Sequence, residues 1–411
     1  MSRQTDLAVV GAGPAGLTAA TVAAEHGLRT LVLDEYPLPG GRLLGQLHEE
    51  RPRGGRPQWW KGGEVARELA ERALRAGVEL CTGVQVWGLE PGWRVYLGGG
   101  PESTVRAPAL LLATGAGERA LPVPGWTLPG VLTVGAAQVF ANVHRVRPGN
   151  RVLICGVDPL ALTVARELTL AGATVLGIVL PPPGPLAGGR AVPASVVADL
   201  CRLAGMAPSP LLRLAGRAFR HAPALGASLY PPGGVRAWGV PLRLKTALLR
   251  ITGSEAVAGA VLAGLDARGR LRPGSERAVA VDCVALSGGL APVVELAAAA
   301  GCRLVPSGLG GLVPLHSPAM ETELPGLLVA GNITGVEGAR VAMAQGRIAG
   351  LTAAHRLGAL PAAAYAAALA TAQAALARTR AEAAIAFYPD ASRSRQALAR
   401  RWQESGDLTA D

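Results

Sequence analysis

The order of hydrophobic and polar positions near the start of the chain predicts a strand, a glycine-rich turn, a helix and a second strand. Leu7–Val10 is a short, uninterrupted apolar run with β-branched valines, which is typical of a strand buried on both faces. A helical stretch follows at Leu17–His26, and a second apolar run covers Thr30–Leu33. This order predicts one unit of a parallel α/β sheet.

The turn between the first strand and the helix has the sequence Gly11-Ala12-Gly13-Pro14-Ala15-Gly16. Its first glycine allows a tight turn, the second lets the backbone approach a pyrophosphate, and the third lets helix and strand pack closely. The helix N-terminus would offer amides to that pyrophosphate, and Asp34, at the end of the second strand, would hydrogen-bond an adenosine ribose. A turn that only needs glycine would not explain all four parts together, so we predict a dinucleotide site.

A second copy of this architecture lies in residues 151–179. Arg151–Cys155 and Thr174–Val179 are its predicted strands, and Leu162–Ala171 is its predicted helix. Its glycine turn is altered, because Asp158 stands at the second glycine position, where it would cap the helix. A carboxylate there takes the place of a pyrophosphate, and no acidic residue ends the second strand. We therefore expect a Rossmann-like fold that has lost ordinary NAD(P) binding.

Three further glycine-containing segments are placed to reach the first dinucleotide site. They are Gly40–Gln46, Ala113–Gly115 after the predicted strand Ala109–Leu112, and Gly331–Ala339 after the predicted strand Pro325–Ala330. Loops that leave the carboxyl ends of parallel strands meet at one edge of a sheet, where a dinucleotide binds. For Gly40–Gln46, a plain surface turn is the alternative.

The predicted fold class is α/β, with two Rossmann-like three-layer dinucleotide-binding domains, the first discontinuous, and a helical C-terminal tail. A proline-rich linker at residues 117–131 and a return linker near residues 287–292 suggest the boundaries. The expected divisions are residues 1–116 and 287–360 for the first dinucleotide-binding domain, 117–286 for the second domain and 361–411 for the helical extension.

Other patterns predict smaller additions to these domains. Short apolar runs between Glu79 and Leu97 suggest a meander inserted in the first domain. From Pro361 the chain is alanine-rich and helical to about Phe387, and a basic helix follows at Ser392–Glu404. The sequence does not indicate a role for that basic helix.

Composition narrows the classes of function. The chain of 411 residues has a formal net charge of +11, but its arginines are scattered among alanine, glycine and proline. A compositional bias explains this better than a nucleic-acid-binding stripe, although a partner with an acidic face stays open. The cysteines show neither CxxC nor metal-ligand spacing, so no metal site is expected. The N-terminal sequence and the lack of a long apolar run predict a cytoplasmic protein without a membrane span.

Three short strings, GAGPAG at Gly11–Gly16, ATG at Ala113–Gly115 and GN at Gly331-Asn332, together resemble the two-dinucleotide-domain flavoproteins that include glutathione and thioredoxin reductases. The longer strings PGGRLLGQ, LLATGAGERALPVPGWTLPGVLTVGAAQ and LLVAGNITGVEGARVAMAQGRIAG are similar to the FAD-binding α subunits of heteromeric amino-acid dehydrogenases. That group includes opine oxidase, hydrogen cyanide synthase, proline and hydroxyproline dehydrogenases and sarcosine oxidase.

The resemblance implies an FAD-dependent oxidoreductase that moves electrons between an acceptor and a partner subunit. It implies a catalytic β subunit related to amino-acid oxidases, a small amino-acid substrate at the level of the complex, and in some relatives an iron–sulfur subunit. The cofactor-binding residues that it and the glycine turn indicate are Gly11, Ala12, Gly13, Pro14, Ala15, Gly16, Asp34, Glu35, Gly41, Arg42, Leu43, Gln46, Ala113, Thr114, Gly115, Gly331, Asn332, Gly338 and Ala339. No catalytic residue is predicted, because the histidines are scattered along the chain.

Two departures from the family pattern bear on the prediction. Asn332 stands where relatives have an aspartate that bonds the ribityl chain of FAD, a bond that an amide can still accept. No cysteine follows Cys302, so any iron–sulfur cluster is expected on a partner chain. Two alternatives to the α subunit stay open, namely a self-contained NAD(P)H-dependent flavin reductase and a structural subunit whose nucleotide is architectural.

Overall fold

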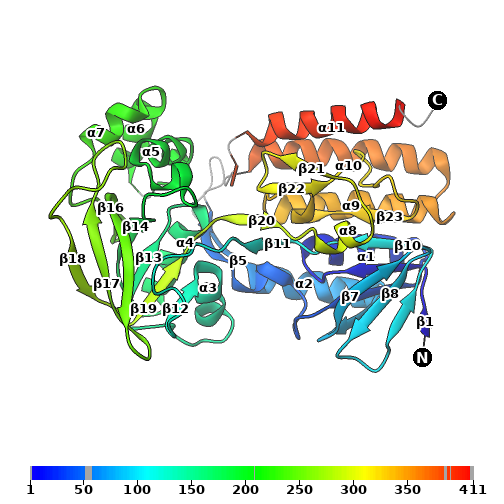
Figure 1. Cartoon of the computed structure of the whole chain (residues 1–411). Coiled ribbons are helices and arrows are strands. Elements are labelled where there is room, and N and C mark those ends of the chain that lie inside the picture. Colours follow the sequence, from blue (N-terminus) through cyan, green and yellow to red (C-terminus); the bar gives the residue numbers. More distant parts are fainter. Residues whose placement is uncertain (1, 51–57, 208, 384–386, 389, 408–411) are drawn as a thin grey trace. The chain divides into compact units, whose positions relative to one another are not determined.

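The structure, a computed structural model, describes residues 2–50, 58–207, 209–383, 387–388 and 390–407. It divides into two compact units (Figure 1). The first contains residues 1–44, 61–117 and 290–411, and the second contains residues 45–60 and 118–289. The short strands β11 (Ala116–Glu118) and β20 (Leu290–Pro292) lie at two of the four places where the chain passes from one unit to the other. None of the helices in the described ranges is long and apolar enough to cross a membrane.

The first unit is built on a parallel five-stranded sheet with the order β23-β10-β2-β3-β6. Its strands are β2 (Leu7–Val10), β3 (Thr30–Asp34), β6 (Glu79–Thr82), β10 (Ala109–Leu112) and β23 (Leu327–Val329). Every residue of β2, β10 and β23 is buried, which explains why their sequences are apolar without alternation.

Helices cover one face of this sheet and a second sheet covers the other. The helices are α1 (Pro14–Glu25), α2 (Gly62–Arg75), α9 (Ala339–Arg356) and α10 (Ala362–Glu382). The other face packs against α8 (Glu295–Ala299) and the sheet β1-β9-β8-β7, formed by Ser2–Gln4, Thr104–Arg106, Arg94–Gly98 and Gln85–Glu90. Helices α1 and α9 pack closely because Gly346 has no side chain, and a Cβ there would lie 2.2 Å from the Ala15 carbonyl oxygen.

One predicted strand lies in a different sheet from the one expected. The segment Glu79–Cys81 was expected in the inserted meander, but it forms β6, which pairs in parallel with β3. The meander consists of β7, β8 and β9, with β1 at its edge. Leu80 packs against the helix-side core, so its apolar contacts favour the main sheet.

The C-terminal helices belong to the first unit. Helix α10 packs on α9, and α11 (Ala391–Asp407) packs on a hairpin of β21 (Leu304–Ser307) and β22 (Gly311–Pro314). Leu398 of α11 is buried against Leu309 and Val313. The helix predicted to reach Phe387 ends at Glu382, and residues 384–386 of that prediction lie outside the described residues.

The second unit contains an eight-stranded sheet with the order β12-β19-β13-β14-β16-β17-β18, and β15 pairs with β16. Pairing is parallel from β12 to β16 and antiparallel beyond. The strands are β12 (Val131–Thr133), β13 (Arg151–Cys155), β14 (Thr174–Leu180), β15 (Val235–Ala237), β16 (Val240–Gly253), β17 (Val257–Gly264), β18 (Arg277–Ala280) and β19 (Cys283–Leu286). Helices α3 (Val134–Asn142), α4 (Pro159–Leu170), α5 (Pro193–Arg202) and α7 (Pro223–Leu229) pack on one face, and α6 (Pro210–Ala218) lies beside α5.

A buried polar network explains why residues 45–60 cluster with the second unit instead of the first. Glu167 of α4 is 2% exposed, and its carboxylate accepts hydrogen bonds from the Gln138 amide (3.0 Å), the Asn142 amide (2.9 Å) and the backbone N–H of Leu47 (3.3 Å). The strand that begins at Leu47, β4 (Leu47–Glu50), pairs with β5 (Gln58–Lys61). The segment is therefore anchored to α3 and α4 by hydrogen bonds that the sequence does not reveal.

Candidate cofactor site

Four segments of the first unit meet at the carboxyl edge of β2, β10 and β23. Gly40 donates its backbone N–H to the Ala12 carbonyl at 2.8 Å, and Ala113 donates to the Val10 carbonyl at 2.8 Å. The turn at Gly331 lies so close to α1 that an added Cβ would be 2.8 Å from the Cβ of Ala15. The three loops expected to approach the first glycine turn therefore do so, at the sheet edge where dinucleotides bind in this type of fold.

The glycines of these segments divide into packed and open positions. A Cβ on Gly11 would lie 2.4 Å from the Ala113 carbonyl oxygen, and one on Gly16 would lie 1.9 Å from the Gly11 carbonyl oxygen. A Cβ on Gly13, Gly115 or Gly338 would meet nothing within 4 Å. The packed glycines hold the turn together, and the open ones border free space along the same edge. This arrangement fits a dinucleotide that lies against bare backbone.

Asp34 is already oriented by the backbone. Its Oδ2 accepts from the Ala12 N–H at 2.5 Å, and its Oδ1 accepts from the Tyr36 N–H at 2.8 Å. A carboxylate has about four acceptor positions, so these two bonds leave room for hydroxyl donors. Its neighbour Glu35 is exposed.

The loop after Asp34 forms a short 3-10 helix over Gly41–Gly45. A Cβ on Gly41 would lie 3.1 Å from the Gly13 Cα, and Arg42 donates from Nη1 to the Ala116 carbonyl at 3.3 Å. Leu43 is 1% exposed and anchors the loop in the core. The loop therefore lies against the glycine turn.

The remaining predicted residues have identifiable positions. Gln46 belongs to the second unit, where its Oε1 accepts from Trp60 Nε1 at 3.0 Å. The Thr114 hydroxyl donates to the Val293 carbonyl at 2.6 Å, which orients the turn after β10. Pro14 is the first residue of α1, and Ala339 is the first residue of α9.

Asn332 is held by the start of the next loop. Its Oδ1 accepts from the Glu337 N–H at 3.3 Å; an amide oxygen has two acceptor positions and an amide nitrogen two donors, so the side chain could both accept from and donate to a ligand hydroxyl. The Gly331 N–H donates to Gln345 Oε1 at 2.9 Å, and the Thr334 hydroxyl donates to the Gly331 carbonyl at 2.9 Å. These bonds fix the backbone at the Gly-Asn pair.

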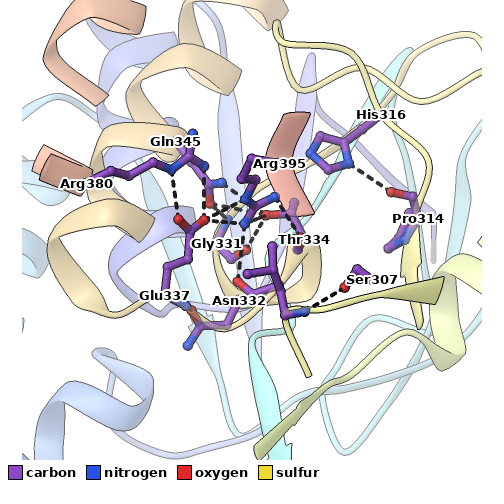
Figure 2. Close-up of polar contacts among 12 residues, drawn as sticks. Ser307, Pro314, His316, Gly331, Asn332, Thr334, Glu337, Gln345, Arg380 and Arg395 are labelled. Carbon is purple, nitrogen blue, oxygen red and sulfur yellow. Dashed lines mark hydrogen bonds and ion pairs between the residues drawn. The ribbon is translucent and has the colours of Figure 1, made fainter. Parts of the chain in front are cut away.

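An ion triad of Glu337, Arg380 and Arg395 connects this loop to the two C-terminal helices (Figure 2). The side chains of Glu337 and Arg395 are 7% and 12% exposed. Arg380 Nε of α10 lies 2.8 Å from Glu337 Oε1, and Arg395 Nε of α11 lies 2.8 Å from Oε2. Arg395 also donates from Nη1 to the Thr334 carbonyl at 2.8 Å. Both C-terminal helices therefore hold the loop that leads from Asn332 to α9.

The triad pairs one carboxylate with two guanidinium groups. Burial alone would raise the pKa of the Glu337 carboxyl, but Arg395 and Arg380 hold that pKa below its usual range. Burial lowers the pKa of Arg395 to about 10, so the guanidinium still carries its charge at neutral pH. The nearby imidazole of His316 is fully buried, and burial together with Arg395 lowers its pKa to about 4. His316 is therefore neutral, and its Nδ1 bonds the Pro314 carbonyl at 2.8 Å.

In the second glycine turn, a side chain of the chain itself, Asp158, bonds the helix N-terminus. Asp158 caps α4, and its Oδ1 accepts from the Ala161 N–H at 2.8 Å. Its Oδ2 accepts from the Ser287 hydroxyl. The cap predicted from the sequence is present, and the carboxylate stands at the helix N-terminus where a pyrophosphate would need the same amides.

Comparison with known proteins indicates the fold and the general class of this protein. The family described as "Pyridine nucleotide-disulphide oxidoreductase" matches residues 5–185, and the family described as "Glucose inhibited division protein A" matches residues 314–361. Among solved structures, L-proline dehydrogenase from P. horikoshii has a TM-score of 0.64 at 17% identity, over 92% of this chain and 60% of that one. The predicted α/β fold class is thereby confirmed.

Among curated proteins, an opine oxidase subunit of Rhizobium meliloti (strain 1021) is 32% identical over 86% of this chain and 71% of its own length. The corresponding opine oxidase subunit of Agrobacterium tumefaciens (strain Ach5) is 31% identical over 85% of this chain. The chain spans 65% of the length of that second relative. The chain belongs to the family of these opine oxidase subunits, which confirms the resemblance stated from its motifs and indicates a flavoprotein of the oxidoreductase class.

Proposed function

We propose that the chain is the FAD-bearing α subunit of a heteromeric dehydrogenase or oxidase for an amino acid or an opine. The contrast between the two glycine turns carries the proposal. Gly13 of the first turn borders open space, whereas Asp158 occupies the second turn. This contrast and the family membership support one FAD site, in the first unit, and no nicotinamide site in the second.

In this proposal the chain binds and orients the cofactor, which supplies the electron transfer. Backbone amides at the start of α1 would hold the pyrophosphate, and Asp34 would hold the adenosine ribose. Asn332 would face the ribityl hydroxyls, in a loop whose backbone is fixed by Gln345 and by the ion triad. An amino-acid-oxidase-like β subunit in the same cytoplasmic complex would oxidise the substrate, and any iron–sulfur cluster would belong to a further chain.

The test begins with the absorbance spectrum of the purified chain, where we expect the bands of oxidised flavin. The chain is then co-expressed with its genomic neighbours and assayed for dye reduction with proline, hydroxyproline, sarcosine and opines. We expect turnover only in the complex with a second subunit. An FAD-loaded chain that is active and never associates with a second subunit would contradict the proposal, and fast bleaching of its flavin by NADH or NADPH would indicate a self-contained reductase.

A further inference from the structure

On the second unit, a hollow of about 220 Å³ lies on the sheet face opposite to α4 and α5. Its apolar lining consists of the half-buried side chains of Leu176 and Val279, which pack against the core on that side of the sheet. Arg151, Arg243 and Arg277 also line the hollow, and they come from three different strands, β13, β16 and β18. The hollow thus combines an apolar surface with three cationic side chains.

Among the residues that the structure describes, none of these three arginine side chains forms an ion pair. In the part of the chain that the structure describes, the side chains of Arg243 and Arg277 form no hydrogen bond, and the Arg151 guanidinium donates from Nε to the Ala280 carbonyl at 3.1 Å. Two carboxylates are nearby in the sequence of these strands. Glu276 pairs with Arg250 at 3.7 Å, and Asp282 accepts from the backbone N–H groups of Asn150 and Arg151, not from the Arg151 guanidinium.

The residues around the hollow add further positive charge and little negative charge. Burial lowers the pKa of Arg243, and the positive charges of Arg277 and Arg236 lower that pKa further. The sequence contains no acidic residue between Asp199 and Glu255, the stretch that includes the whole of β15 and β16. Like charges gathered without a partner are unfavourable, and a bound anion would remove the repulsion.

We propose that this hollow binds a small organic anion that carries a carboxylate or phosphoryl group on a compact apolar body. Guanidinium groups offer paired N–H donors that match the oxygens of either group. The half-buried side chains of Leu176 and Val279 suit an apolar body, and a volume of about 220 Å³ restricts the ligand to a small molecule. All of the residues that line the hollow belong to the second unit. The proposed anion site therefore goes beyond the proposed function, and it does not depend on the FAD site of the first unit.

The test uses the full chain, loaded with flavin, in isothermal titration at fixed ionic strength. The probes are benzoate, phenyl phosphate, inorganic phosphate and the neutral benzyl alcohol. We expect saturable binding of benzoate or phenyl phosphate, at least tenfold tighter than inorganic phosphate, and none of benzyl alcohol. Stronger binding of benzoate than of phenyl phosphate assigns the site to carboxylates, and the reverse assigns it to phosphate esters.

Variants locate the binding. We expect Arg243→Gln, and the more exposed Arg277→Gln, to weaken the preferred anion at least tenfold while thermal melting and flavin absorbance stay unchanged. Arg217→Gln, which removes an exposed arginine from α6 of the same unit, is the matched control and should bind like the parent chain. Equal binding by the parent chain and both hollow variants, or no saturable binding of any anion at millimolar concentration, would overturn the proposal.

Discussion

At the scale of single residues, different glycines of the first turn serve cofactor binding and folding. Gly13 has an extended backbone (φ −74°, ψ −178°) that any residue can adopt, and its Cβ would point into open space. We expect Gly13→Leu to fold with a thermal midpoint within about 2 °C of the flavin-free parent chain, because it disturbs no packing. Its affinity for FAD should fall at least a hundredfold, because the leucine side chain fills the space proposed for the cofactor. Fluorescence titration with FAD measures this affinity.

Gly16→Ala is the contrasting variant. Its Cβ would lie 1.9 Å from the Gly11 carbonyl oxygen, so α1 would have to move away from β2. We expect it to destabilise the chain itself, with a lower melting midpoint whether or not FAD is present. Equal flavin retention in Gly13→Leu and the parent chain would contradict the assigned site. If Gly13→Leu lost flavin but kept full turnover in the complex, the nucleotide would be architectural.

Glu167 gives the second unit a pH dependence of stability. Burial raises its pKa to about 7 against a reference of 4.5, so the folded chain binds a proton that the unfolded chain releases. Its contribution to the free energy of unfolding therefore falls as the pH rises from about 4.5 to about 7, by about 3 kcal/mol in total. We expect the difference in unfolding free energy between the parent chain and Glu167→Gln to change across this range. Denaturant titrations at pH 5, 6.5 and 8 measure it, and a difference independent of pH would contradict the assignment.

At the scale of elements, the ion triad links α10 and α11 to the loop after Asn332. Arg395→Gln would leave the Glu337 carboxylate short of one of its two partners, and losing one member of a buried pair typically costs about 3–5 kcal/mol. We therefore expect lower stability and weaker FAD binding from this variant. Arg356→Gln breaks the exposed pair with Glu321 on the same unit and should cost about 0–1 kcal/mol, with FAD binding unchanged.

The pH dependence of the triad has the opposite sign to that of Glu167. Because the pKa of Glu337 is lowered in the folded chain, its contribution is present above the ordinary glutamate range and is lost as the pH falls below about 4. Stability curves of the parent chain and Glu337→Gln should converge in acid. If Arg395→Gln bound FAD as tightly as Arg356→Gln does, the C-terminal helices would have no part in holding the cofactor loop.

These elements also show what sequence patterns can predict. The strands β2, β3, β10 and β23 and the Asp158 cap depend on neighbouring residues, so hydrophobic patterns and local motifs were enough to find them, whereas the pairing partner of β6 was not predicted. The contact of Arg395 with Glu337 joins residues 58 positions apart, and an arginine in a basic helix gives no sign of being buried. The position of Gln46 depended on the anchoring of its segment by Glu167, again a contact of tertiary origin.

At the scale of the whole molecule, each unit has its own hydrophobic cores, so each is expected to give a separate melting transition. A ligand at 100 times its dissociation constant stabilises the state that binds it by about 2.7 kcal/mol, which corresponds to several degrees for a unit of this size. In calorimetry we therefore expect FAD to raise one transition in the parent chain and neither in Gly13→Leu. NADH at 1 mM, about the upper end of common KM values, should move neither transition, because Asp158 occupies the second turn. A shift of the other transition by NADH would show that the second unit still binds a nicotinamide cofactor and would favour the self-contained reductase.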